Sequence, residues 1–238
     1  VHVIDCLFKH ISQNIMLIAD SDIVYFKNTM VKNFNSNRPD QIQNTILFLV
    51  QNVKLLLLSN SLFKDIEFPV ISFSLITDTS LLNTTFESCV CPIRFKILHN
   101  NFNTRFSLLS CTFFSCVCNS GGGALKITLM NTFYETNERK RNKLRTISHN
   151  IQLIIYIKHT VLNNSCSDLN GGSIAVNLLH HSDKLITIVY ITNSLFYNNT
   201  AGKQGGAVYI SNVDLVSFKN CRFALNKATN GAALALYR

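Results

Sequence analysis

The chain alternates short apolar stretches with small polar groups, and one unit of this pattern recurs eight times. Each unit ends in a large apolar residue, here called the anchor. The anchors are Phe8, Val31, Phe63, Phe86, Phe113, Leu162, Phe196 and Phe223. The residue three positions before the anchor is Asn in five units, and the residue two positions before it is always Cys, Thr or Ser. This agreement across eight copies indicates an internal structural repeat.

Apolar residues on either side of the anchors predict strands. They fall seven and five residues before the anchor, as at Phe106 and Leu108, which is the period of a strand with one buried face. Helical periodicity is absent, which argues against units that alternate strands with helices. Three units carry a glycine pair nine and ten residues after the anchor, and apolar alternation resumes behind it: Gly122-Gly123, Gly171-Gly172 and Gly205-Gly206. These glycine pairs predict tight corners between strands.

The distances between anchors predict a β-solenoid. Successive anchors lie 23, 32, 23, 27, 49, 34 and 27 residues apart, and the short steps suit one coil of two or three brief strands. A leucine-rich repeat fits less well, because it expects a helical segment where a glycine corner follows here. The longest step contains residues 131–150, where alternation stops and charge accumulates. We therefore predict an all-β chain, a right-handed parallel β-helix of about eight coils, with a basic loop inserted at 131–150.

Composition agrees with one folded domain over residues 1–238. The chain is 47% hydrophobic and 15% charged, which excludes wholesale disorder. No apolar run reaches the 18 or so residues of a membrane-spanning helix. The chain begins without a methionine or a signal-like segment and stops within an alternating pattern. We therefore expect a fragment of a longer chain that continues into further coils or caps at both ends.

Stacking of the coils predicts where repeated residues lie. Equivalent residues of adjacent coils should be about 4.8 Å apart, the spacing of neighbouring strands. The anchors should then form one interior column, and the Asn residues before them a ladder of amides that bond from coil to coil. Both features are structural.

The C-terminal half resembles a known family. Its motifs are Phe196-Tyr197-Asn198-Asn199 with Gly205-Gly206-Ala207-Val208, Phe113 with Gly122-Gly123-Ala124-Leu125, and Phe223 with Asn226 and Gly231-Ala232. They resemble the paired FxxN and GGAI repeats of chlamydial polymorphic outer-membrane proteins, which other right-handed parallel β-helix proteins share. The resemblance implies a β-helix of the pectate-lyase-like superfold in a secreted or surface-exposed protein, often an adhesin.

Four cysteines form the sharpest local motif. Cys89 and Cys116 lie three residues after an anchor, and Cys91 and Cys118 lie five after, in consecutive coils. Each pair should therefore be adjacent, which permits disulfides in an oxidising compartment. Two Cys-x-Cys segments with thiols on one strand face would permit a zinc site instead. The third alternative is a ladder of small buried thiols.

Charge gathers in the inserted loop. The chain has 22 basic and 13 acidic residues, a net charge of +9. Five of the basic residues lie together in the insertion: Arg139, Lys140, Arg141, Lys143 and Arg145. They would suit an acidic partner such as a sulfated glycan, an anionic lipid or nucleic acid, or they form a solvated loop tip. No recognition motif supports nucleic-acid binding.

The sequence offers no catalytic or cofactor motif, and apart from the cysteines it offers none for a metal. Polysaccharide lyases and glycoside hydrolases of the pectate-lyase-like superfold need clustered carboxylates, and the acidic residues here do not stack in register. We therefore expect a non-enzymatic scaffold, adhesin-like, extracellular or on a cell surface, that binds acidic glycans or host or cell-surface proteins. The alternative function is that of a polysaccharide lyase or glycoside hydrolase of the same superfold. Sequons at Asn83, Asn163 and Asn198 are no more frequent than chance predicts, and Asn83 is expected to be inaccessible in the ladder.

Overall fold

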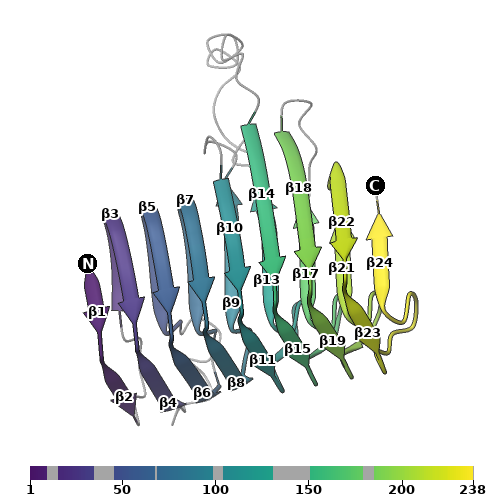
Figure 1. The fold of residues 1–238 in the computed structure, drawn as a ribbon, viewed down its shortest axis with the longest axis horizontal. Coiled ribbons are helices and arrows are strands. Elements are labelled where there is room, and N and C mark those ends of the chain that lie inside the picture. The colour runs from purple at the N-terminus through teal and green to yellow at the C-terminus, as the bar shows by residue number, and fades with distance from the viewer. Residues whose placement is uncertain are drawn as a thin grey trace.

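The structure is a computed structural model that describes residues 1–9, 16–34, 46–67, 69–98, 104–130, 151–178 and 185–237. These residues form 24 strands, which pair in parallel within three sheets. Within the same residues no helix is long and apolar enough to cross a membrane. The chain is thus an all-β parallel solenoid, and its coils stack along one axis from β1 to β24 (Figure 1).

The three sheets follow the sides of the solenoid. Sheet A contains 13 strands: β1 (His2–Ile4), β3 (Met16–Lys27), β5 (Phe48–Ser59), β7 (Ile71–Leu82), β9 (Ile93–Leu98), β10 (Thr104–Leu109), β13 (Leu125–Met130), β14 (Ile151–Lys158), β17 (Ile174–Leu178), β18 (Leu185–Thr192), β21 (Val208–Ser211), β22 (Leu215–Lys219) and β24 (Leu234–Tyr237). Sheet B contains eight: β2 (Leu7–Lys9), β4 (Met30–Phe34), β6 (Leu62–Ile66), β8 (Thr85–Cys89), β11 (Thr112–Phe114), β15 (Val161–Asn163), β19 (Leu195–Tyr197) and β23 (Arg222–Ala224). Sheet C contains three: β12 (Val117–Cys118), β16 (Cys166–Ser167) and β20 (Thr200–Ala201).

Sheet A wraps around two sides of the core. β7 pairs with β9 through residues 71–74 and with β10 through residues 78–82. Two shorter strands of the next coil therefore occupy the place of one long strand. The buried rings of Phe95 on β9 and Phe106 on β10 meet with centroids 5.4 Å apart. The inward side chains of β9 and β10 therefore face each other across the core, and Figure 1 shows the two sets of strands as separate layers.

Early coils differ from the brief strands that the sequence predicts. β3, β5 and β7 each run unbroken for 12 residues. Asp20 in β3 and Asn52 in β5 have φ values of 53° and 50°, and the Asn52 amide bonds the Asp20 carboxylate. A left-handed residue turns the strand locally without ending the sheet pairing, so no separate loop is needed there.

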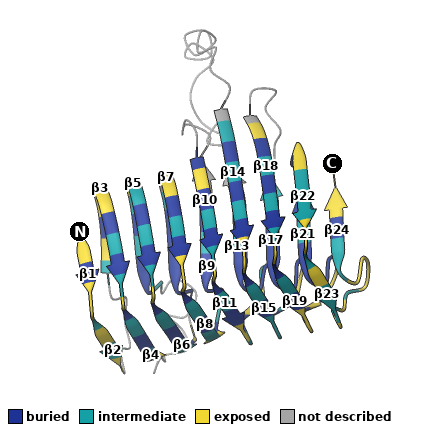
Figure 2. Ribbon diagram, viewed as in Figure 1, coloured by how far each residue is buried: buried dark blue, intermediate teal, exposed yellow. Residues whose placement is uncertain are grey.

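The anchor column is confirmed in full. Strand pairing in sheet B places the eight anchors in one continuous register: Phe8, Val31, Phe63, Phe86, Phe113, Leu162, Phe196 and Phe223. Neighbouring Phe rings stack with centroids 4.7–5.0 Å apart. The anchors of the six inner coils are fully buried, whereas those of the end coils are partly exposed (Figure 2).

Backbone geometry explains the two polar positions before each anchor. In all eight coils the residue three before the anchor has a φ of 48–54°, the left-handed region that Asn tolerates best. The next residue donates its hydroxyl or thiol to the carbonyl two residues earlier, as Thr84 does to Leu82 at 3.0 Å. Only Ser, Thr and Cys are small enough for the interior and still carry such a donor. The preference for Asn at the first position and for Ser, Thr or Cys at the second therefore follows from the backbone conformation of the corner.

The amide ladder also forms, but it lies outside the core. Asn83 donates to the Asn60 amide oxygen at 3.3 Å, and Asn220 donates to Asn193 at 3.2 Å. These side chains are exposed. The expectation that Asn83 is inaccessible is therefore wrong, because the left-handed corner turns its side chain toward solvent.

A second, buried amide ladder follows the anchors. Asn199 lies three residues after Phe196, and its amide donates to the Leu162 carbonyl and to Asn226 at 3.0 and 2.9 Å. The Asn226 amide in turn donates to the Phe196 carbonyl at 3.0 Å. Buried amides are stable only when they are bonded in this way, which explains the last letter of the FxxN motif.

Each glycine of a pair has its own role, as Gly171 and Gly172 show. Gly171 has a φ of +67°, which a side chain would strain. A Cβ on Gly172 would lie 2.0 Å from the Gly206 carbonyl oxygen of the next coil. The second glycine is therefore required for close stacking of adjacent coils.

Candidate functional site

The basic segment predicted as an anionic-ligand loop lies outside the described residues. Arg139, Lys140, Arg141, Lys143 and Arg145 all fall between the end of β13 and the start of β14. Their interpretation as a binding loop stays a prediction.

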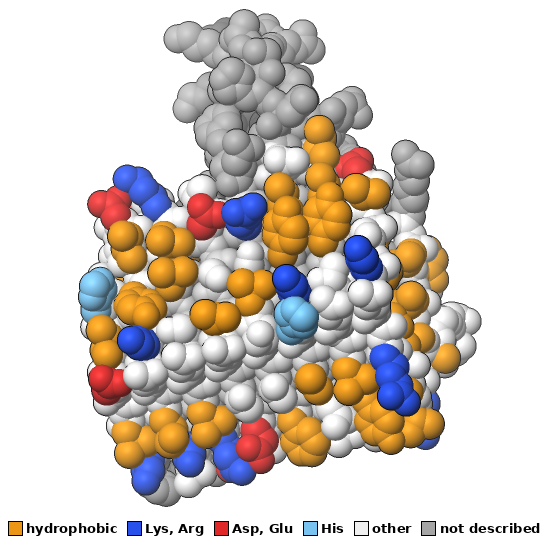
Figure 3. Space-filling view, in the orientation of Figure 1, with side chains coloured by type: hydrophobic (Ala, Val, Ile, Leu, Met, Phe, Trp, Pro, Cys, Tyr) orange, Lys and Arg blue, Asp and Glu red, His pale blue; other side chains and the backbone are white. Residues whose placement is uncertain are grey.

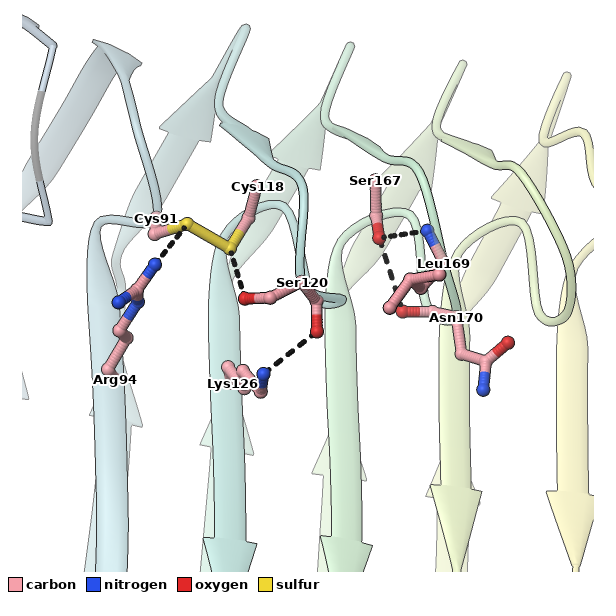
Figure 4. The surroundings of a disulfide bond; sticks show 8 residues. All are labelled: Cys91, Arg94, Cys118, Ser120, Lys126, Ser167, Leu169 and Asn170. Atoms are coloured by element: carbon pink, nitrogen blue, oxygen red, sulfur yellow. Dashed lines mark hydrogen bonds between the residues drawn. A yellow bond between two sulfur atoms is a disulfide. The ribbon is translucent and has the colours of Figure 1, made fainter. Parts of the chain in front are cut away.

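The four clustered cysteines are adjacent but differ in state. Val90 pairs with Val117, which sets the neighbouring residues of the two coils in register. A disulfide joins Cys91 to Cys118, whose Cα atoms are 4.6 Å apart (Figure 4). Cys89 and Cys116 are buried free thiols.

Local backbone direction separates the two pairs. Cys89 is the last residue of β8, points into the core, and donates to the Phe63 carbonyl at 3.4 Å. Cys91 has a φ of 43°, so its side chain turns to the corner instead. The four sulfurs therefore do not converge on one site as the zinc alternative requires. The described residues contain no group of three or more His, Cys, Asp or Glu side chains placed to hold a metal.

An outward-facing surface on β10, β14 and β18 is the strongest candidate site. It is lined by Arg105, Ser107, Leu109, Tyr156, Ile157, Lys158, Tyr190 and Thr192, around a shallow depression of about 510 Å³. We call this surface the tyrosine face. Figure 3 shows hydrophobic side chains gathered on this side of the molecule, with Lys and Arg beside them.

Two stacked rings form the centre of the tyrosine face. Tyr156 and Tyr190 are register partners, and their ring centroids are 5.2 Å apart with planes inclined by 16°. The Arg105 guanidinium carbon lies 5.3 Å from the centroid of Tyr156, within cation–π range. The rings are half-buried and Arg105 is exposed, so both ring surface and guanidinium are accessible to a ligand.

Charges on the tyrosine face favour an anionic ligand. Lys158, two residues after Tyr156, is exposed, and Lys219 is the register partner of Thr192 in the next coil. Asp78 is the register partner of Arg105. None of the side chains that line the depression is a carboxylate. The lining of the depression thus combines aromatic rings with cations.

Sequence reasoning missed this surface, although a signal exists. Tyr156 and Tyr190 lie six residues before their anchors, between the two inward positions of the alternation. That position is occupied by Ser in three of the other units. An aromatic ring at an outward strand position of two consecutive coils indicates a stacked surface pair.

Comparisons with known proteins agree with the repeat. The Chlamydia polymorphic membrane protein (Chlamydia_PMP) repeat matches residues 193–211, which run from the exposed amide ladder through β19, β20 and the glycine pair to β21. A transmembrane domain-containing protein of Dictyostelium discoideum is 30% identical over 97 residues, which cover 34% of this chain and 6% of that protein. No solved structure matches the chain with significance. The chain is therefore a parallel β-helix that carries a repeat similar to that of chlamydial polymorphic membrane proteins.

Proposed function

We propose that this chain is a non-enzymatic, adhesin-like scaffold in an extracellular or cell-surface protein, and that its tyrosine face binds acidic glycans. The observation that carries the proposal is the accessible Tyr156–Tyr190 stack with Arg105 beside it. The β-helix is the rigid support that holds these side chains in register.

The chemistry of the tyrosine face suits an acidic sugar chain. Tyr rings combine a large apolar surface with a polar tip, so they can pack against the C–H side of a sugar and still bond its hydroxyls. A guanidinium binds carboxylate and sulfate groups through two parallel hydrogen bonds. The basic residues of 139–145 precede β14, which carries Tyr156, and we include them as a second contact for the same ligand.

Two observations support an extracellular or surface setting. The Cys91–Cys118 disulfide is of a kind that persists in oxidising compartments. The repeat similar to that of the chlamydial membrane proteins points the same way.

Binding to immobilised acidic and neutral oligosaccharides tests the proposal. Tyr156→Ala or Arg105→Gln should weaken binding of the acidic ligand by about tenfold or more, since Tyr and Arg side chains often dominate the binding energy of an interface. Tyr25→Ala is the matched control, because Tyr25 occupies the same repeat position on β3 and is also half-buried. Equal binding by all variants, or equal loss in the control, contradicts the proposal.

The enzyme alternative needs a separate measurement. A polysaccharide lyase or glycoside hydrolase of the pectate-lyase-like superfold would release unsaturated or reducing ends from polygalacturonate. A scaffold should retain the polymer without turnover. Product release that depends on a carboxylate of this chain would replace the scaffold proposal with the enzyme.

A further inference from the structure

Three cations project from the side of the solenoid opposite the tyrosine face. Arg94 and Lys96 belong to β9, and Lys126 belongs to β13. The rings of Phe95 and Phe106 meet inside the core, so Arg94 and Arg105, which flank them, point outward on opposite sides. The three cations therefore form a separate group, here called the cationic cluster.

Strand register holds the cationic cluster together. Arg94 and Lys126 are direct partners in the parallel pair of β9 and β13, and Lys96 is two residues further along the same side. Partners in adjacent strands are about 4.8 Å apart at the backbone, and like charges placed opposite each other are destabilising. The strand register thus places positive charges side by side on one surface.

Two of the three cations, Arg94 and Lys126, bond neutral groups. The Arg94 guanidinium donates to the Cys91 sulfur of the disulfide at 3.1 Å, and the Lys126 ammonium donates to the Ser120 carbonyl at 2.8 Å (Figure 4). Within the described part of the chain, no carboxylate lies at ion-pair distance from any of the three. The Nε of Arg94 is buried and has no hydrogen-bond partner.

Two charges of the cationic cluster are partly removed from water. Arg94 and Lys126 are half-buried. Desolvation lowers the pKa of Lys126, and the charges of Arg94 and Lys96 lower it further. The hydrogen bonds of Arg94 and Lys126 go to neutral acceptors, so no carboxylate of the described residues balances the positive charge of the cluster.

We propose that the cationic cluster is a binding site for a tetrahedral oxyanion, a sulfate or phosphate group either free in solution or attached to a glycan. Ser74 and Thr128 are the register partners of Lys96 on either side, and their hydroxyls add neutral donors around the charge. Arg94 and Lys126 supply the partly desolvated charges, and Lys96 closes the exposed edge. The site stands whether or not the tyrosine face binds glycans.

The Arg94 Nε–H signal in a ¹⁵N NMR spectrum of the whole chain tests the site directly. The signal is assigned by its loss in Arg94→Lys. The probes are inorganic sulfate, inorganic phosphate, a sulfated oligosaccharide and the same oligosaccharide without sulfate. We expect the first three to shift the signal in a saturable way and the desulfated sugar to leave it in place. No saturable shift with any probe, or an equal shift with the desulfated sugar, overturns the proposal.

Two matched lysine variants complete the test. Lys96→Gln removes an exposed side chain and should weaken binding of the oxyanion by about tenfold. Lys9→Gln, at an exposed position of β2 outside both surfaces, should leave the affinity unchanged. Equal losses would show diffuse attraction by net charge and overturn the site. Tighter binding of the sulfated oligosaccharide than of inorganic sulfate assigns a glycan source, and equal affinity assigns a free anion. Tyr156→Ala should not alter the Arg94 shift, which separates this site from the tyrosine face.

Discussion

Residues at the corners of each coil are selected by backbone conformation before any ligand. The left-handed residue three positions before the anchor would cost most side chains about 1–2 kcal/mol, and Asn is among the few that adopt this conformation readily. A second left-handed residue lies two positions after the anchor in seven coils, with φ values of 51–55°. Asn, Asp and Ser occupy six of these seven positions, and Leu225 occupies the last. Much of the high Asn content of the chain is therefore structural.

Buried thiols make stability depend on pH in the alkaline range. Burial raises the pKa of Cys111 to about 11 and that of Cys116 to about 12, from an ordinary value of 9.0. The unfolded chain ionises these thiols first, so the stability they contribute is complete below pH 9 and is lost as pH rises toward the folded pKa. Each thiol should lower the free energy of unfolding by about 1.4 kcal/mol per pH unit in that window.

Cys116→Ser tests this effect, because it replaces the thiol with a hydroxyl that does not ionise in this pH range. Ser already occupies the equivalent position of the next coil, at Ser165. We expect the free energy of unfolding of the Ser variant to fall less steeply between pH 9 and 10.5 than that of the parent. Urea unfolding measures it, with Cys91→Ser and Cys118→Ser in both proteins to prevent disulfide exchange. Parallel pH profiles would contradict a neutral thiol in the core.

The fold is stabilised by the anchor column rather than by any single strand. Strands of sheet B are three to five residues long, too short to be stable alone. Their stability comes from stacking, since each anchor packs against those of the coils before and after it. The sides of sheet A add a second aromatic group that includes Phe73, Phe95 and Phe106.

Phe113→Ala should therefore be severely destabilising. The side chain is fully buried and stacks on Phe86 at 4.9 Å, so its loss leaves a cavity in a central coil. We expect a loss of roughly 3–5 kcal/mol in the free energy of unfolding. Phe114→Ala is the control, because this neighbour in β11 is 39% exposed and should cost less than about 1 kcal/mol. Similar losses in both variants would place Phe113 outside the column.

The whole molecule is a stack in which each coil contacts its neighbours. The Cys91–Cys118 disulfide is a covalent link across one of these interfaces, between residues 27 apart in the chain. It restricts the unfolded chain by closing a loop of that length. Its effect should extend to the full domain if the coils unfold together.

The double variant Cys91→Ser with Cys118→Ser should remain folded and lose about 3–4 kcal/mol of unfolding free energy. Thiol counting on the denatured parent should give six free thiols without reductant and eight after reduction. Eight thiols in protein recovered from its native compartment would contradict the oxidising setting of the proposed function.

The repeat, the anchors and the all-β fold could all be predicted from the amino-acid sequence. One unit recurs with the same residue types at fixed offsets, so an alignment of the copies also gives the stacking of the coils. Phe63 could be paired with Phe86 without coordinates, because neighbouring parallel strands leave little freedom of register once one side is buried. Adjacency of Cys91 and Cys118 followed from the same alignment.

Tertiary structure decided which outward residues meet and which thiols bond. Arg105 and Tyr156 lie 51 residues apart in the sequence, and only the stacking of β10 on β14 brings them together. Outward positions do not contribute to the core, so the repeat constrains them weakly and leaves no strong pattern. Cys89 and Cys91 look equivalent in sequence, but a left-handed φ at Cys91 turns one sulfur to the corner while its neighbour faces the core. Side-chain direction at a corner depends on backbone angles that hydrophobic alternation does not encode.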